Sequence, residues 1–434
     1  MGLINIYKKF SRGIMWNSIF YTIYKTLSVA LSFALYATLT AEQFWQWAGA
    51  KALIFILILW LDCGFKRSIP RYCPVFAKNK RTHRLFIQAI LLFQSILLAT
   101  VGSSLLWYLL TCCSLYKYII PLRWYVLALF VSKGMVAVFR SLFHAQFKQK
   151  EFNLILIGVL FLETLSIFLL LFFFSSNPLL IPCMFLTATA SSIIIVIGSL
   201  LFLPILYHDK QYPEDEPVDL KQASKNFIVH SAVMWAGLIV KSFSERNILF
   251  PYLTATIGMI SANSFKIAHE AALFFQRIAL TILGIADTAL LAHVEEGSKK
   301  KTALKNAFTR LYNYVIIVCA VLLALIAISL YIHPAILKQS NALSIFLIVA
   351  LGYLIEVFLS PYERILETKQ DYKLLWIAYT PYLLTIVGSL LFSVAQNYSL
   401  VTFMGLLHAA RLSGAFLMAV FASRKYQLPL PKIL

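Results

Sequence analysis

Long apolar segments alternate with short polar stretches along the whole sequence. Twelve of them are long enough to cross a hydrocarbon core about 30 Å thick, since a helix rises about 1.5 Å per residue. They are predicted at residues 13–38, 44–61, 85–110, 119–143, 152–174, 179–206, 226–249, 259–291, 309–332, 342–362, 374–395 and 399–422. Because membrane-spanning backbone needs internal hydrogen bonds, continuous apolar runs without strand alternation predict an all-α polytopic membrane protein. A mean hydropathy of +0.79 places the chain outside the soluble range.

A hydrophilic insert at residues 207–225 separates two groups of six apolar segments. It carries charges of both signs, and we expect it to be a cytoplasmic linker. The two groups also resemble each other, because SRGIMWNSIFYTIYKTLSVALSFALYATLTAEQF aligns with SKNFIVHSAVMWAGLIVKSFSERNILFPYLTATIG. This internal repeat predicts two pseudo-symmetric six-helix lobes, residues 1–206 and 226–434, around a central cavity.

The distribution of positive charge predicts how the chain is oriented. The net charge is +20, from 38 Lys and Arg residues against 18 Asp and Glu residues. Outside the apolar segments, 27 basic residues fall on one side of the predicted membrane and three on the other. By the positive-inside rule, both termini are expected in the cytoplasm. Anionic membrane lipids are sufficient partners for this charge, so no nucleic-acid partner is expected.

Eight basic residues lie inside the apolar segments, where a charge is costly and usually functional. They are Lys25, Lys51, Lys133, Lys241, Arg246, Lys266, Arg277 and Arg411. Lys25, within YTIYKTLSVALSF, lies near the middle of its span, where an ammonium costs about 2.5 kcal/mol or more. At the offset of the repeat, Lys25 lies two residues from Lys241, and Lys51 lies one residue from Lys266. Matching helices that face one cavity bring such cations together near the midplane.

Polar side chains recur at helical spacing in three of the segments. The first segment carries Asn17, Tyr21, Tyr24, Lys25, Ser28, Ser32 and Tyr36. The seventh carries His230, Lys241 and Glu245, with Arg246 beside them. The eighth carries Asn263, Lys266, Glu270, Arg277, Thr281 and Thr288. Because residues three and four apart share a helix face, these sets predict a cationic, water-filled cavity.

The cations also have structural explanations. Lys51 lies about 10 Å inside the end of its predicted span, so its ammonium can extend back to the headgroups. Others can be neutralised by acidic residues, in the pairs Lys241–Glu245, Lys266–Glu270 and Arg411–Glu356.

Convergent Lys and Arg at low dielectric favour an anionic ligand, and a pyrophosphate accepts many charge-assisted hydrogen bonds at once. The sequence has no GxxxxGK[ST] loop, no HExxH motif and no nucleophile elbow. The six cysteines are expected to be free thiols, and we expect neither a cofactor nor a metal. These observations favour a secondary carrier that alternates access around a fixed site, not an enzyme.

Four stretches, SRGIMWNSIF, LTAEQFWQWAGAKALIFIL, LDCGFKRSIPRY and FRSLFHAQFKQ, resemble the polysaccharide (O-antigen) flippases of the multidrug/oligosaccharidyl-lipid/polysaccharide (MOP) exporter superfamily. The resemblance implies a flippase of the bacterial cytoplasmic membrane that moves an undecaprenyl-pyrophosphate-linked oligosaccharide. It implies that the pyrophosphate is bound by Lys25, Lys51, Lys241, Arg246 and Lys266. Arg277 joins these candidate residues, and sugar contacts are implied for Asn17, Tyr21 and Tyr24.

The turn DCGFKRSIPR resembles an aspartate, glycine and arginine at the cytoplasmic end of the family's second helix, here Asp62, Gly64 and Arg71. Gly64 permits a tight exit from the helix, and Asp62 paired with Arg71 is expected to brace a gate. An ordinary basic cytoplasmic loop is the alternative.

Two other functions remain open. A MATE multidrug exporter carries cationic drugs in exchange for sodium or protons, and it needs carboxylates within its lobes. The candidates for coupling are Glu163, Glu245, Glu270, Asp287 and Glu356. The first segment has a lysine and no acid, which favours the flippase. A non-transport scaffold for envelope assembly leaves the buried cations unexplained.

Overall fold

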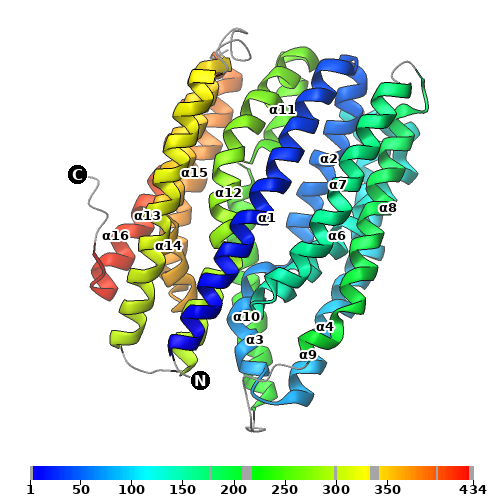
Figure 1. Ribbon diagram of the computed structural model, residues 1–434. Coiled ribbons are helices and arrows are strands. Elements are labelled where there is room, and N and C mark those ends of the chain that lie inside the picture. The colour runs from blue at the N-terminus through cyan, green and yellow to red at the C-terminus, as the bar shows by residue number, and fades with distance from the viewer. Residues whose placement is uncertain are drawn as a thin grey trace.

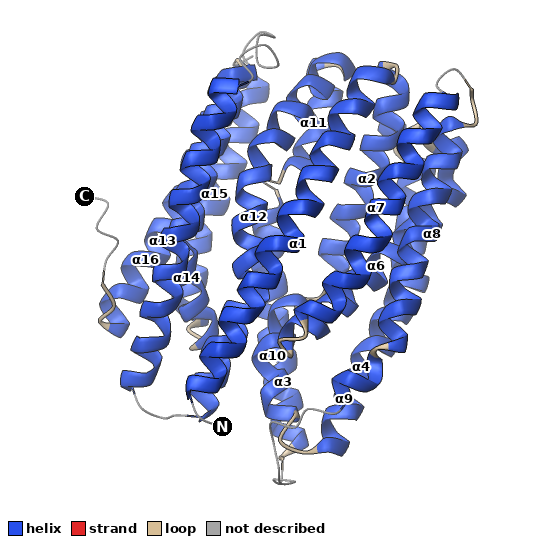
Figure 2. Cartoon of the chain, in the orientation of Figure 1, coloured by secondary structure: helices blue, strands red, loops and turns tan. Residues whose placement is uncertain are grey.

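The computed structural model describes residues 3–174, 177–207, 218–243, 245–297, 301–332, 342–396 and 399–429, and in these residues it contains helices and no strand (Figure 2). The helices before the insert are α1 (Leu3–Thr38), α2 (Ala41–Leu61), α3 (Phe65–Phe76), α4 (Lys80–Leu97), α5 (Ser103–Cys112), α6 (Arg123–Ala145), α7 (Gln149–Phe174), α8 (Leu180–Leu201) and α9 (Leu203–Tyr207). After it come α10 (Leu220–Ser242), α11 (Arg246–Ile257), α12 (Met259–Gly297), α13 (Lys301–Ile332), α14 (Ala342–Thr368), α15 (Tyr372–Gln396) and α16 (Leu400–Tyr426). Of the predicted linker, residues 208–217 lie outside the described residues.

Within the part of the chain that the structure describes, eleven of the twelve predicted segments coincide with helical spans that are long and apolar enough to cross a membrane. The third span joins α4 to α5 through a π-helical turn at Leu98–Gly102, and the seventh combines α10 and α11. The remaining predicted segment is α12, which is 39 residues long. It contains Lys266, Glu270 and Arg277.

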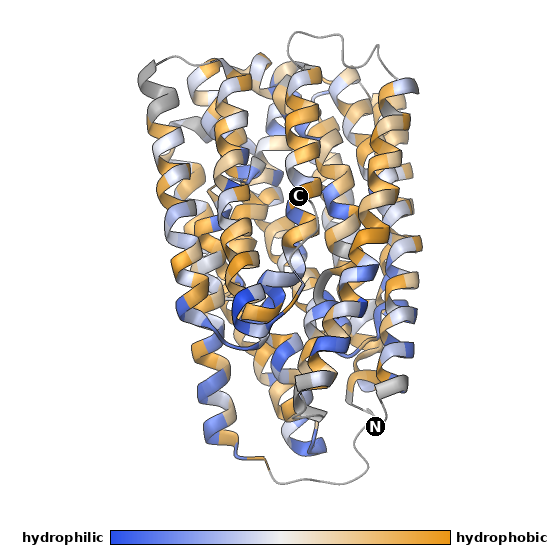
Figure 3. Ribbon diagram, turned by 90° about the vertical axis from the view of Figure 1, so that its left-hand side faces the viewer, coloured by the Kyte–Doolittle hydropathy of each residue, from blue (hydrophilic) through white to orange (hydrophobic). Residues whose placement is uncertain are grey.

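The outward surface of the bundle is apolar. Phe172 on α7 and Leu201 on α8 are 79% and 75% exposed, and neither has a role in a packed core. Exposed apolar side chains of this size are stable when lipid covers them. In Figure 3 hydrophobic residues dominate the upper part of the helices, and hydrophilic residues are more frequent lower down. The protein is therefore an all-α, multi-pass membrane protein.

The helices form two groups joined by α1 and α12. Figure 1 places α4, α6, α7 and α8 on one side of the bundle and α13 to α16 on the other. Helix α1 packs against both α7 and α12, and α12 packs against α14. The N-terminus lies at the end of the bundle that carries α3 and α10 (Figure 1), which we call the basic end because Lys66, Arg67 and Arg71 lie there.

The turn between α2 and α3 fits closely against α10. Gly64 has a φ of +76°, a conformation that side-chain-bearing residues rarely adopt. A Cβ atom at this position would lie 2.1 Å from the carbonyl oxygen of Ser231 and 2.8 Å from the backbone nitrogen of Trp235. Gly64 is therefore required both by the backbone angle and by the contact between the two parts of the chain.

We expect Gly64→Ala to lower the thermal stability of the purified protein clearly, because backbone atoms of α10 must move to admit the methyl group. The matched control is Gly158→Ala on α7, where nothing lies within 4 Å of the added Cβ. Alanine is favoured over glycine in a helix by about 1 kcal/mol, so the control should be neutral or stabilising. Thermal unfolding in detergent measures both changes; equal effects of the two substitutions would refute the close-packing argument.

Candidate functional site

A cavity of about 280 Å³ lies between helices from both parts of the chain. Its charged lining residues are Lys25 on α1, Lys51 on α2, Lys133 on α6, Glu163 on α7, and Lys266, Glu270 and Arg277 on α12. Five cations thus face two carboxylates, which gives a formal charge of 5 − 2 = +3. On α1 the lining runs from Tyr24 to Leu35, in the half of the helix remote from the basic end.

The backbone and aromatic rings hold the cavity lysines in place. The ammonium of Lys266 donates a hydrogen bond of 2.8 Å to the carbonyl oxygen of Ala48, which bridges α12 and α2. The ammonium of Lys51 lies 3.9 Å from the ring centroid of Trp47 one turn before it, and that of Lys25 lies 4.6 Å from the ring of Tyr24. These cation–π contacts attract the two ammonium groups to the aromatic rings.

Lys133 belongs to the cavity although the sequence did not assign it there. Its ammonium lies 3.6 Å from Glu163 Oε2, and the Glu163 side chain is 7% exposed. That oxygen makes no hydrogen bond in the described structure. Glu163 therefore places in the cavity wall an oxygen that has an ion-pair partner and makes no hydrogen bond among the described residues.

Two residues that were predicted to contact sugar lie outside the cavity. Asn17 is completely buried where α1 packs against α7 and α12: its amide donates to the carbonyl oxygen of Ile282 at 3.3 Å and accepts from Asn153 at 2.9 Å. Tyr21 is 1% exposed, and its ring lies 4.5 Å from the guanidinium carbon of Arg140. Tyr24 does line the cavity. The side chains of Arg246 and Thr281 are outside the described residues.

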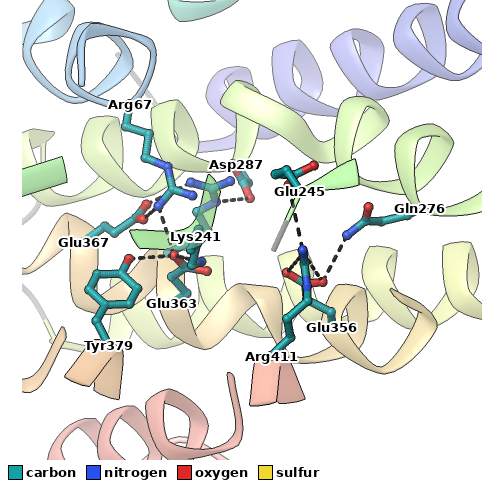
Figure 4. A network of polar contacts seen from close by, with 11 residues as sticks. Arg67, Lys241, Glu245, Gln276, Asp287, Glu356, Glu363, Glu367, Tyr379 and Arg411 are labelled. Atoms are coloured by element: carbon teal, nitrogen blue, oxygen red, sulfur yellow. Dashed lines mark hydrogen bonds and ion pairs between the residues drawn. The ribbon is translucent and has the colours of Figure 1, made fainter. Parts of the chain in front are cut away.

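Lys241 lies in a second charged cluster (Figure 4), together with Arg67 of the basic end. Its ammonium pairs with Glu363 on α14, whereas its predicted helical partner Glu245 lies 3.9 Å from Arg411. We define the junction cluster as Arg67, Lys241, Asp287, Glu363, Arg364, Glu367 and Tyr379. It joins α3, from the first part of the chain, to α10, α12, α14 and α15 from the second. Sequence reasoning missed all of these except Lys241 and Asp287.

Arg411 on α16 makes the predicted pair with Glu356 on α14. Two of its contacts with the Glu356 carboxylate measure 2.7 Å and 2.9 Å, and Gln276 on α12 donates to the same carboxylate at 3.1 Å. The Arg411 side chain is 4% exposed. Among the residues that the structure describes, no group of three or more His, Cys, Asp or Glu is arranged to hold a metal.

The predicted gate residues flank the exit from α2. The Asp62 carboxylate accepts hydrogen bonds from the backbone N–H of Lys66 at 3.1 Å and 3.2 Å, so it caps the first turn of α3. Arg71 is 8% exposed within α3. Burial raises the pKa of Asp62 to about 6, and the neighbouring N–H and the charges of Lys66 and Arg67 only partly oppose it.

The raised pKa makes a pH-dependent prediction for Asp62→Asn. The folded-state pKa lies above the ordinary value of 3.8, so the folded protein binds the proton more tightly than the unfolded chain. The stability contributed by Asp62 therefore falls as pH rises from about 4 to 6 and is constant above that range. We expect the Tm of Asp62→Asn, relative to the wild type, to rise across this window. A Tm difference that is independent of pH would contradict the assignment.

The fold is that of the MATE transporters. The Vibrio cholerae MATE transporter VcmN matches with a TM-score of 0.65 and 13% identity over 98% of this chain and 97% of that one. A multidrug resistance MATE family transporter of the MOP superfamily, in an outward-facing conformation, matches with a TM-score of 0.61 and 13% identity over 95% of each chain. A MOP superfamily transporter from Pyrococcus furiosus, for which reverse polarity of the binding pocket suggests a different function, matches with a TM-score of 0.61 and 12% identity over 98% and 96%. No protein-family model matches the sequence, and a comparison with curated protein sequences found no match.

Proposed function

We propose that this protein is a MOP-type transporter that moves a lipid-linked anionic headgroup across the membrane by alternating access. The specific substrate we propose is an undecaprenyl-pyrophosphate-linked oligosaccharide. The observation that carries the proposal is the cavity in which five cations face two carboxylates. Because the cations come from helices before and after the insert, a bound anion would hold both parts of the chain together.

The chemistry of a pyrophosphate suits this cavity. Its oxygens accept charge-assisted hydrogen bonds from several ammonium and guanidinium groups at once, and such bonds are about twice as strong as neutral ones. Lys25, Lys51 and Lys266 present compact charges, while Arg277 offers a planar fork of donors. A volume of about 280 Å³ suits the pyrophosphate and an adjoining sugar. A longer glycan requires the cavity to widen as the two parts separate.

Two carboxylates in the cavity are the proposed sites for a coupling cation, either sodium or a proton. Glu163 on α7 and Glu270 on α12 both face the cations that would bind the substrate. Neutralising either carboxylate would raise the positive charge of the cavity and strengthen the binding of an anion. Proton or sodium binding is therefore proposed to promote substrate binding on the side where it occurs.

A MATE-type exporter of cationic drugs is the second candidate function. It is supported by the fold and by Glu163, which is buried in the cavity with one oxygen that makes no hydrogen bond among the described residues. The two functions predict opposite ligand charges. An anionic competitor should displace a flippase substrate, whereas it should not displace a cationic drug.

The test is a reconstitution in proteoliposomes with a fluorescent lipid-linked oligosaccharide pyrophosphate. We expect protein-dependent movement of the lipid between leaflets, with inhibition by inorganic pyrophosphate. The control is a lipid of the same chain length that carries a neutral headgroup. Transport of a cationic dye without movement of the lipid-linked sugar would instead support the drug exporter.

A further inference from the structure

Three donors from three helices converge on one carboxylate oxygen in the junction cluster (Figure 4). Arg67 Nη1 on α3 lies 3.0 Å from Glu363 Oε1, and the Tyr379 hydroxyl on α15 donates to the same oxygen at 3.0 Å. The Lys241 ammonium on α10 donates to it as well. The Arg67, Lys241 and Glu363 side chains are each less than 20% exposed. An arginine, a lysine and a tyrosine hydroxyl therefore surround a single oxyanion.

The charges of the junction cluster balance. Arg67 also pairs with Glu367, and Arg364 pairs with Glu367 at 2.9 Å and with Asp287 at 3.4 Å. Three cations and three carboxylates thus share one partly buried volume. Removing one charge leaves its partner uncompensated, which is strongly unfavourable at low dielectric. An anion that takes the place of the Glu363 carboxylate keeps Arg67 and Lys241 compensated, provided that Glu363 moves away from them into a solvated position.

The ion pairs of the junction cluster connect the two parts of the chain near the basic end. Beside Arg67, Gln370 donates to the Tyr72 hydroxyl at 2.6 Å, and Trp60 Nε1 donates to the Ser242 hydroxyl at 3.0 Å. In an alternating-access cycle, opening the cavity toward the basic end would separate the two parts of the chain and with them these contacts. Arg67 must then leave Glu363, because the two residues belong to different parts of the chain.

We propose that Arg67, Lys241 and Tyr379 form an anion-binding site for a phosphate of the substrate headgroup, and that the carboxylate of Glu363 fills this site while the junction is closed. The inference deepens the proposed function and rests on it for the identity of the anion. Substrate phosphate competes with Glu363 for Arg67 and Lys241, and so loosens the junction as it binds. This site is separate from the cavity, whose lining does not include these residues.

The first test measures the binding of inorganic pyrophosphate to purified protein by calorimetry. Glu363→Gln removes the internal competitor and retains the size of the side chain, so it should tighten binding about tenfold or more, equivalent to about 1.4 kcal/mol. Adding Lys241→Ala should abolish that gain. The matched control is Glu356→Gln, because Glu356 is also an ion-paired glutamate on α14. This substitution should not tighten pyrophosphate binding. An unchanged affinity in folded Glu363→Gln, or an equal gain in the control, overturns the proposal.

Measuring the same series in a Lys25→Ala background separates this site from the cavity. The cavity contribution to pyrophosphate binding should fall there, and the gain from Glu363→Gln should persist. If the gain persists but no lipid-linked sugar is transported, the junction site stands and the proposed function fails. If the gain disappears together with the cavity contribution, the separate junction site is refuted.

A second test needs no change within the cluster. In a variant whose native cysteines are replaced by serine, Ser231→Cys places a thiol on α10 beside Gly64, where Ser231 is 3% exposed. Pyrophosphate should raise its rate of reaction with a water-soluble maleimide. The control is Ser199→Cys on α8, since Ser199 is fully buried away from the junction. A labelling rate at Ser231→Cys that does not respond to pyrophosphate contradicts displacement of Glu363.

Discussion

Lys25→Ala is expected to reduce transport of the lipid-linked anion by about tenfold to a hundredfold, because a hydrogen bond to a charged group contributes about 1.5–3 kcal/mol. Lys25 lines the cavity with four other cations, and its ammonium is oriented by the ring of Tyr24. Replacing it with alanine removes a charge without removing a core side chain, so the amount of protein in the membrane should not change. Proteoliposome transport and complementation of a flippase-deficient strain measure the effect.

The controls for this prediction separate charge from position. Lys25→Arg keeps a cation on the same helix face and should retain most of the activity. Lys117→Ala removes a cation of the same type from an exposed position outside the cavity, and it should have no effect on transport. Normal transport by Lys25→Ala would remove Lys25 from the mechanism, and an equal loss in Lys117→Ala would show that overall charge is the cause.

Helical periodicity was enough to predict most of the cavity cations. The repeat matched Lys51 with Lys266, and both line the cavity, as does Arg277 on the predicted face of α12. The repeat also matched Lys25 with Lys241, but Lys241 lies in the junction cluster and not in the cavity. Spacings of three and four residues give the angle of a side chain around its helix, which is why these predictions agree with the lining. Such spacings do not show which neighbouring helix packs against that face at a given position along the helix. Asn17 lies on the same stripe as Lys25, but at that level α7 and α12 cover α1.

The junction cluster could not be predicted in the same way. Arg67 and Glu363 are 296 positions apart, and nothing in the sequence brings them together without the packing of α3 against the second part of the chain. Arg67 was counted among the basic residues of a loop, although residues 65–76 form a helix. A basic residue directly after a span was the available signal, but the positive-inside rule already explained it.

The partner of Lys241 shows how a helix boundary changes such a prediction. An i,i+4 pair with Glu245 requires a continuous helix, but α10 ends at Ser242 and α11 begins at Arg246. Glu245 has extended backbone angles, φ −78° and ψ 139°, so its side chain leaves the face of Lys241. Lys241 pairs instead with Glu363. The apolar run over residues 226–249 gave no indication of this break.

Arg411→Ala is expected to destabilise the protein by about 3–5 kcal/mol, the usual effect of removing one partner of a buried ion pair. The substitution leaves the partly buried carboxylate of Glu356 with Gln276 but without its guanidinium, and it also removes packing against the ring of Tyr353. Thermal unfolding of the purified protein in detergent measures the loss. The double variant Arg411→Met with Glu356→Leu replaces both charges with apolar groups of similar volume and should recover most of the stability.

A pair whose cation is half exposed supplies the comparison for Arg411. Lys425 pairs with Asp371, and the lysine side chain is 50% exposed. When the lysine is removed, the Asp371 carboxylate keeps the hydrogen bond that it accepts from the Tyr426 hydroxyl. Lys425→Ala should change stability by less than about 1 kcal/mol. If Arg411→Ala is as mild, the guanidinium is not needed to compensate Glu356 during folding. If the double variant folds stably but no longer transports, the pair serves the transport cycle, because stability alone would be satisfied by methionine and leucine.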